Sequence, residues 1–182
     1  MLNKAADMYN RAEALAESCK GTPIYDAYEE LVGFPVRATA NLLYMQLCAG
    51  RNKALALMRC PSANIYADYV DMCFKNDSLL QEMYHALADG KWSGMMGSEH
   101  IGFRRWNDEE AAYPLRSYVY PSRKPRMSVR LSDSDIVTCG GDWTGQTLTA
   151  AAFLDPARES FGITIENAGT GDVEWEASSD TE

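Results

Sequence analysis

A glycine-rich stretch, residues 89–97, leads into the side chains of this sequence that are best suited to ligand chemistry. Aromatic rings bind the apolar faces of sugars, so the rings in this region could form a sugar-stacking surface, and the alternative is that they pack the loop itself. His100 lies in the same region, and a catalytic histidine would need a nucleophile and an orienting partner, neither of which the sequence places. Two roles stay open for it, contact with a ligand and support of the loop. The aromatic candidates are Trp92, Phe103, Trp106 and Tyr113.

The acidic and sulfur-containing side chains form no pattern typical of a catalytic or metal site. Glu29-Glu30 and Glu109-Glu110 are sequence neighbours, which do not face each other on a helix and make poor acid–base pairs. Asp133, Asp135 and Asp142 fail the EF-hand spacing, and the five cysteines include no CxxC. No nucleotide-binding glycine loop occurs. The sequence therefore predicts no catalytic residue, no metal site and no cofactor.

Apolar residues that recur every three or four positions predict helices over most of the first 106 residues. One helix covers residues 2–19 and stops before Gly21. A second begins at Thr22-Pro23, kinks near Pro35 and ends near Ala49. We expect its buried stripe to contain Ala27, Leu31, Ala38, Leu42, Met45 and Ala49.

Three shorter helical segments are predicted after the second helix. The first covers residues 54–58, and the second starts near Ser62 with Ile65, Tyr69, Met72 and Cys73 on one stripe. A break is expected at Asn76-Asp77-Ser78, because Ser78 and Gln81 have the spacing of a capping box that would open the third segment.

The hydrophobic period changes to two near residue 127, which predicts β-strands. Alternating runs occur at 127–131, 136–137, 161–165 and 173–177, and the last two are expected to form a hairpin. Four short strands leave one apolar face of a sheet uncovered, so the β part is expected to be incomplete. The predicted class is α+β, a mostly helical bundle followed by a short antiparallel β domain. The predicted division is a bundle with its packed loop at 1–106, an extended linker at 107–126 and a β domain at 127–182.

The net charge of −9 lies entirely in residues 129–182, which carry two Lys or Arg and eleven Asp or Glu. An acidic chain without a basic stripe argues against a nucleic-acid partner. No apolar run is long enough to span a membrane, and the N-terminus lacks the apolar core of a signal peptide. We therefore expect neither nucleic acid nor membrane as a partner.

Three separated segments resemble glycoside hydrolase family 115, the xylan α-1,2-glucuronidases. Ala27-Tyr28-Glu29-Glu30-Leu31-Val32-Gly33-Phe34-Pro35-Val36-Arg37-Ala38-Thr39-Ala40-Asn41 is similar to the kinked-helix signature of that family. Arg59-Cys60-Pro61-Ser62-Ala63-Asn64-Ile65-Tyr66-Ala67-Asp68 resembles a second family stretch. Gly90-Lys91-Trp92, Met95-Met96, His100-Ile101-Gly102-Phe103 and Trp106 resemble a third, in which Ser93 and Gly94 depart from the family pattern.

This resemblance implies a helical bundle and the start of a β-sandwich that follow a catalytic barrel. The barrel of the family removes 4-O-methylglucuronic acid from glucuronoxylan by an inverting mechanism with separated carboxylates. We expect this chain to be a non-catalytic C-terminal part that supports such a barrel, and to be inactive alone. The implied partners are the upstream barrel and glucuronoxylan, with a homodimer as a further candidate. The family is typically secreted or periplasmic. The carbohydrate or domain-contact candidates are Lys91, Trp92, His100 and Trp106.

A stand-alone carbohydrate-binding or protein-interaction module is the alternative function.

Overall fold

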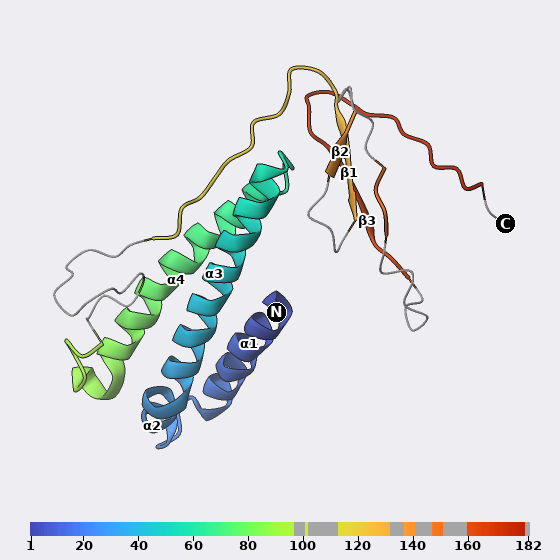
Figure 1. The fold of residues 1–182 in the computed structure, drawn as a ribbon. Helices are drawn as coiled ribbons and strands as arrows, with labels where there is room; N and C mark the ends of the chain where they lie inside the picture. Colours follow the sequence, from blue (N-terminus) through green and yellow to red (C-terminus); the bar gives the residue numbers. More distant parts are fainter. Residues whose placement is uncertain (97–100, 102–112, 132–136, 141–146, 151–159, 181–182) are drawn as a thin grey trace. The chain divides into compact units, whose positions relative to one another are not determined.

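The computed structural model divides the chain into two compact units, coloured along the sequence in Figure 1. The first unit contains residues 1–51 and 65–116, and the second contains residues 52–64 and 117–182. The predicted class is confirmed: the described part of the chain is mostly helical, with one small antiparallel sheet. The predicted divisions at 106 and 126 stay predictions. The structure describes residues 1–96, 101, 113–131, 137–140, 147–150 and 160–180.

Helices account for almost all of the described residues up to Gly90. They are α1 (Leu2–Cys19), α2 (Tyr25–Tyr28), a π-helical turn (Glu29–Gly33), α3 (Phe34–Leu57) and α4 (Ala63–Gly90). Gly21, with a φ of 76°, lies just after α1, as predicted. The predicted separation of the second helix from residues 54–58 is wrong, because α3 runs through Gly50 without a break. Gly50 is exposed and a side chain there would meet open space, so the glycine marks no close approach.

The predicted kink at Pro35 is a π-helical turn that ends two residues before the proline. A π-turn adds one residue to the helical repeat, so residues before it are rotated relative to those after it. The buried stripe predicted with a constant period is therefore wrong before and within the turn: Ala27 is exposed and Leu31, inside the turn, is 72% exposed. After the turn, Met45 and Ala49 are buried as predicted.

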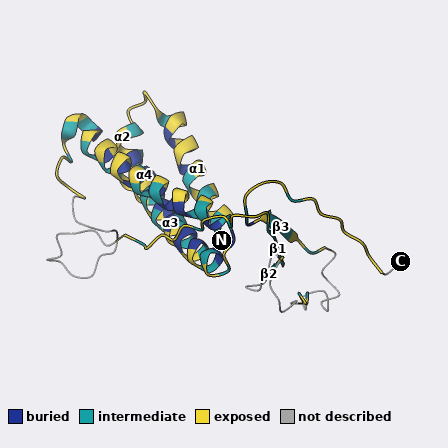
Figure 2. Ribbon diagram, turned by 90° about the horizontal axis from the view of Figure 1, so that it is seen from above, coloured by how far each residue is buried: buried dark blue, intermediate teal, exposed yellow. Residues whose placement is uncertain are grey.

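Two apolar clusters form the core of the first unit, and Figure 2 shows the buried residues in dark blue along the helices. One cluster joins α3 to α4, and the other surrounds Phe34, whose ring centroid lies 4.5 Å from that of Tyr84. Helix α1 contributes only alanines to the buried set, which allows its backbone to approach its neighbours closely. The first cluster contains Met45, Cys48, Ala49, Val70, Cys73 and Ile101; the second contains Phe34, Leu80, Tyr84 and Leu87; the buried alanines of α1 are Ala5, Ala12 and Ala16.

Helix α4 continues through Asn76-Asp77-Ser78, so the predicted break is wrong. Side chains that favour helix caps do so by bonding nearby backbone. Here Asn76 bonds Tyr9 and Asn41 instead, and Asp77 accepts a hydrogen bond from Gln81 Nε2 at 3.2 Å, one turn further on. Asn76 is thus used in packing between helices, and Gln81 of the predicted capping box bonds a side chain of the same helix. The backbone leaves helical geometry only at Leu87–Asp89.

A tight turn joins α3 to α4 within the second unit. The Cys60 N–H donates to Leu55 O at 2.9 Å and the Arg59 N–H donates to Ala56 O at 3.0 Å, which is the Schellman pattern of a helix C-terminus. Arg59 holds the left-handed position, with φ at 57°, where glycine is the usual residue. Leu55, Cys60 and Ala63 are fully buried, so the turn has an apolar base of its own.

The sheet has three strands in the order β2-β1-β3, and both pairs are antiparallel. The strands are β1 (Met127–Leu131), β2 (Val137–Cys139) and β3 (Ile163–Asn167). Ser128 and Leu131 are the buried residues of β1, so burial along this strand does not follow the predicted alternation of Met127, Val129 and Leu131. Glu166 of β3 forms an ion pair with Arg130 of β1, with the two atoms 3.5 Å apart.

The predicted hairpin of residues 161–165 with 173–177 is wrong, because β3 pairs with β1. Residues 172–179 have no strand assignment, and Trp175 is 59% exposed. The chain turns after β3 through Asn167, whose Oδ1 accepts from the Gly169 N–H at 2.9 Å. Gly169 then lies against Ser122 in an isolated parallel bridge, and a Cβ at Gly169 would overlap Lys124 O. The turn after β3 instead brings the chain back to the segment before β1.

Residues 113–121 have no helix or strand assignment, and two alternate residues within them are held by Asn52, in the last part of α3, and Asn64, at the start of α4. The Ser117 N–H donates to Asn52 Oδ1, and Asn52 Nδ2 donates to Ser117 O, both at 2.8 Å. The Val119 N–H donates to Asn64 Oδ1 at 2.8 Å, and Asn64 Nδ2 donates to Val119 O at 3.0 Å. We call residues 117–120 the strap and the two asparagines the clamp.

Candidate functional site

Lys91 and Trp92, two of the predicted contact residues, lie in the turn that follows α4. Lys91 Nζ is 4.5 Å from the centroid of the Trp92 ring, a cation–π distance. Trp92 is half-buried and packs on the cluster around Phe34. His85 supports the same turn, with Nε2 2.6 Å from Met95 O. In this arrangement the Trp92 ring contributes to the core, while Lys91 is exposed.

The other predicted candidates, His100 and Trp106, lie outside the described residues, as does Phe103. Tyr113 is described, and its ring centroid lies 4.2 Å from that of Phe74 in an edge-to-face arrangement. The proposed grouping of these residues with Lys91 and Trp92 stays a prediction. Asp133, Asp135 and Asp142 also lie outside the described residues.

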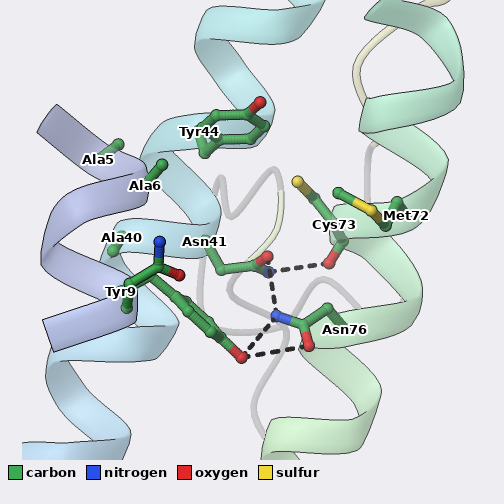
Figure 3. Close-up of a pocket in the computed structure, with 10 residues that line it drawn as sticks. Ala5, Ala6, Tyr9, Ala40, Asn41, Tyr44, Met72, Cys73 and Asn76 are labelled. Carbon is green, nitrogen blue, oxygen red and sulfur yellow. Dashed lines mark hydrogen bonds between the residues drawn. The ribbon is translucent and has the colours of Figure 1, made fainter. Parts of the chain in front are cut away.

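A pocket of about 330 Å³ opens between α1, α3 and α4, and Figure 3 shows the residues that line it. Alanines of α1 and α3 make room for it, and the side chains of Tyr44 and Met72 enclose it. Most of the lining is apolar, which suits a small apolar group rather than a charged one. The lining residues are Ala5, Ala6, Tyr9, Asn10, Ala40, Asn41, Tyr44, Met72, Cys73 and Asn76.

A chain of hydrogen bonds between side chains lies at one end of this pocket (Figure 3). Tyr9 OH and Asn76 Oδ1 are 3.3 Å apart, and Asn76 Nδ2 donates to Asn41 Oδ1 at 3.1 Å. Asn41 Nδ2 donates to Cys73 O at 2.8 Å. The chain joins α1, α4 and α3 through polar groups that bond one another. It fixes the positions of the three helices, which is a structural role.

Burial favours the neutral forms of three side chains in or beside the pocket, Cys48, Cys73 and Tyr44. Burial raises the pKa of the Cys48 thiol to about 11 and that of the Cys73 thiol to about 12. Burial also raises the pKa of Tyr44 to about 12. A thiol acts as a nucleophile only as the thiolate, so neither cysteine is suited to nucleophilic chemistry at neutral pH. The pocket can hold an apolar group but supplies no acid–base pair.

A buried ion pair lies at the π-helical turn, and sequence reasoning missed it. Glu29 is 1% exposed and Arg37 is 4% exposed, and Arg37 Nη2 donates to Glu29 Oε2. Arg37 Nε also donates to Gly33 O at 3.3 Å, a carbonyl within the turn. A Cβ at Gly33 would overlap Glu29 Oε2, so the pair needs a glycine at this position. Sequence analysis treated the adjacent Glu29 and Glu30 only as a poor acid–base pair, and a constant helical period places Glu29 outside the predicted buried stripe.

One residue of the clamp and one of the pocket could have been singled out from the sequence, because each is an asparagine at a buried position of α3. Asn41 and Asn52 continue the buried stripe of α3, three residues after Ala38 and three after Ala49. An amide at a core position needs a partner, because burial of an unpaired polar group is costly. Such asparagines indicate contacts between elements, but the sequence does not show which elements provide them.

Among the described residues, no group of three or more His, Cys, Asp or Glu side chains is arranged to hold a metal ion. Within the same part of the chain, no helix is long and apolar enough to cross a bilayer. In comparisons with known proteins, no family model matches the sequence, and no curated protein is significantly similar to it.

Proposed function

We propose that this chain is a non-catalytic supporting part of a xylan α-glucuronidase of the family that its sequence resembles. In this proposal its helical unit supports a catalytic barrel carried by other residues. The barrel supplies the separated carboxylates of the reaction, and the present chain supplies a rigid surface.

The observation that carries the proposal concerns the polar residues of the two helical segments that resemble the family. Glu29 and Arg37 bond each other, and Arg37 also bonds Gly33 O. Asn41 donates to Cys73 O, and Asn64 bonds both main-chain groups of Val119. Each of these side chains that could act on a substrate is therefore engaged in bonds within the chain. Such residues build a scaffold, which supports a role beside a catalytic domain.

The purified chain, incubated with glucuronoxylan or aldouronic acids, is expected to release no 4-O-methylglucuronic acid. Added to a separately produced barrel domain of the family, it is expected to bind and to raise the melting temperature of that barrel, since a partner that binds only the folded state stabilises it. Turnover by the chain alone, lost when one of its own carboxylates is replaced, would contradict a non-catalytic role. A folded chain that does not bind the barrel would favour the second candidate function.

The second candidate, a protein-interaction module, is favoured by an apolar stripe on α4. Its side chains recur at intervals of three, four and seven residues and are between 37% and 59% exposed. Exposed apolar surface of this kind often marks an interaction site. Met72 belongs both to the stripe and to the pocket lining. The stripe contains Ile65, Tyr69, Met72, Leu79 and Met83.

The stripe is tested by Leu79→Glu, with Leu115→Glu as a matched control that is 91% exposed and lies outside it. Sedimentation of both variants and of the unaltered chain should show self-association that only Leu79→Glu weakens. Equal behaviour of the three proteins would exclude the stripe as a contact between copies, and the barrel-binding assay would then decide between the two functions.

A further inference from the structure

The face of α1 that lines the pocket has large side chains only at its two ends. Leu2 packs against one core cluster and Tyr9 against the other. Positions 5 and 6 complete this face at the helical spacing i, i+3, i+4 and i+7, and both are alanine. The Tyr28 hydroxyl also donates to Ala12 O at 2.9 Å. Helix α1 is therefore held along its length, and the space beside its two small residues stays open.

The opposite wall of the pocket belongs to α4. Figure 3 shows Met72 and Cys73 across the pocket from the alanines, with the Tyr44 ring at the end away from the hydrogen-bonded chain. Ala40 of α3 is 1% exposed, so the pocket reaches the interior of the helical unit. Its volume of about 330 Å³ lies in the range of ligand pockets, about 300–1,000 Å³. An apolar cavity of about 150 Å³ already holds benzene, so this pocket has room for a molecule of one or two rings.

The polar end of the pocket has a donor that is not used. A carboxamide has two N–H donors. Asn41 Nδ2 gives one of them to Cys73 O, and among the described residues nothing accepts the other. Asn41 is only 6% exposed, so this second N–H is largely removed from bulk water. A buried donor without a partner costs free energy, and an acceptor on a bound molecule would satisfy it.

The chemistry of the lining favours an uncharged occupant. Among the described residues, the pocket lining contains no Lys, Arg, His, Asp or Glu. Burial raises the pKa of Cys73 and that of Tyr44 to about 12, so both groups are neutral at pH 7. An ion that entered this pocket would lose its hydration and gain no opposite charge. A neutral molecule loses much less on entry.

We propose that the pocket between α1, α3 and α4 is a binding site for a small neutral molecule with an apolar body of one or two rings and one hydrogen-bond acceptor, which bonds Asn41. Met72 is 53% exposed and lines the pocket, and its unbranched side chain adapts readily to the shape of a neighbour. This binding is separate from the proposed support of a catalytic barrel, so either can fail without the other.

The first test compares three molecules of similar size on the unaltered chain. Acetophenone has one ring and one carbonyl acceptor, toluene lacks the acceptor, and benzoate carries a charge. In an NMR titration followed through the methyl signals of Ala5, Ala6 and Met72, acetophenone should bind saturably. It should bind about fivefold more tightly than toluene, the effect of one hydrogen bond of typical net strength. Benzoate should bind about tenfold more weakly than acetophenone, or not at all, because its charge would be desolvated.

The outcomes of this series separate the parts of the proposal. Only acetophenone should shift the side-chain amide signals of Asn41. Equal affinity for toluene and acetophenone would overturn the bond to Asn41. Benzoate that binds as tightly as acetophenone, or acetophenone that does not saturate the signals, would overturn the site as a whole.

A second test fills the pocket with a side chain. Ala6→Leu places three further carbon atoms against the space, and Ala14→Leu makes the same substitution at an exposed position of α1 outside the pocket. One additional methylene in an apolar pocket changes affinity by about tenfold or more. Ala6→Leu should therefore weaken acetophenone binding at least about tenfold, and Ala14→Leu should leave it unchanged. Equal affinity in the two variants, with the helical circular dichroism retained, would contradict the proposed site.

A third measurement does not depend on either variant folding. In the unaltered chain, the ring protons of acetophenone should show intermolecular nuclear Overhauser effects to the methyl groups of Ala5 and Met72, which line the pocket from α1 and α4. Saturable binding without these two contacts would locate the molecule elsewhere on the chain and overturn the proposal.

Discussion

Two turns, one in each unit, bury polar side chains in different ways. At the π-helical turn, the first unit encloses a full ion pair, Glu29 with Arg37. At the α3–α4 turn, the second unit uses neutral amides, of which Asn52 is fully buried and Asn64 is half-buried. A buried charge is tolerated only beside its partner, whereas a neutral amide that loses a partner costs much less. A single substitution should therefore cause a large loss of stability at the ion pair and a smaller loss at the amides.

The largest effect is expected for Arg37→Met, which leaves Glu29 charged and unpaired in the core. Removal of one partner of a buried pair destabilises by about 3–5 kcal/mol, and urea unfolding measures this loss. The double variant Glu29→Met/Arg37→Met removes both charges and should recover most of it. If the double variant were as unstable as the single one, packing rather than charge would explain the loss, and the contrast between the units would disappear.

A smaller effect is expected for Gly33→Ala, because the new methyl group would overlap Glu29 Oε2 and displace the ion pair. Overpacking of this kind costs about 1–3 kcal/mol. Gly50→Ala, within α3, is the matched control: its new methyl group meets open space, and it should stabilise by about 0.5–1 kcal/mol. Changes of the same sign in both variants would show that helix propensity, and not the ion pair, decides the result.

Substitutions of the two clamp asparagines should lower the free energy of unfolding by different amounts. Asn52→Ala leaves Ala63 O without its bond from Asn52 and releases Ser117, so about 1–3 kcal/mol is expected. Asn64→Ala releases only Val119, a half-buried residue, and about 0.5–1.5 kcal/mol is expected. Thermal unfolding of both variants provides the comparison. A loss for Asn64→Ala as large as that for Arg37→Met would contradict the difference between charged and neutral sites.

The smallest effect at neutral pH, and a growing one at alkaline pH, is expected from the buried thiols. The pKa values of Cys48 and Cys73 rise from 9.0 to about 11 and about 12 in the folded protein. The unfolded chain therefore loses these protons first, so their contribution is complete below pH 9 and is lost as pH rises through the folded values. Unfolding measured from pH 8 to 11 should show the decline, and Cys73→Ala should reduce its slope. An unchanged slope would assign the decline to other groups.

Sequence analysis predicted secondary-structure elements correctly where the hydrophobic period was regular. It failed where a residue that usually ends an element makes a long-range contact instead. Strand β1 and the helix before Gly21 were predicted, as was the general change from helix to strand. The break at Asn76-Asp77-Ser78 failed because Asn76 is a packing residue, and its partners Tyr9 and Asn41 are 67 and 35 residues away. The hairpin at the C-terminal end failed because β3 pairs with β1, whose partner residues lie 32 to 40 residues earlier.

The site was predicted less well than the fold, for a related reason. Apolar periodicity reports which face of a helix is buried only if the repeat is constant, and the π-helical turn alters it between Glu29 and Gly33. A constant repeat therefore places Glu29 on the surface and Leu31 in the core, the reverse of what the structure shows. Asn41 of the pocket and Asn52 of the clamp are visible in the sequence as polar residues that continue an apolar stripe. Their partners are not, because main-chain acceptors carry no sequence signal.

The clamp also has a consequence for how this chain can change over evolutionary time. Substitutions at the strap are nearly silent, provided that proline is avoided at Ser117 and Val119, because the bonds use atoms common to all other residues. Asn52 and Asn64 have no such freedom. Among descendants of this chain, Asn52 and Asn64 should therefore be retained while the sequence of the strap varies. Covariation between the asparagines and the strap residues would be weak, although they are in direct contact. The main-chain groups that the asparagines bond are the same in every residue type except proline, so a substitution in the strap requires no compensating change.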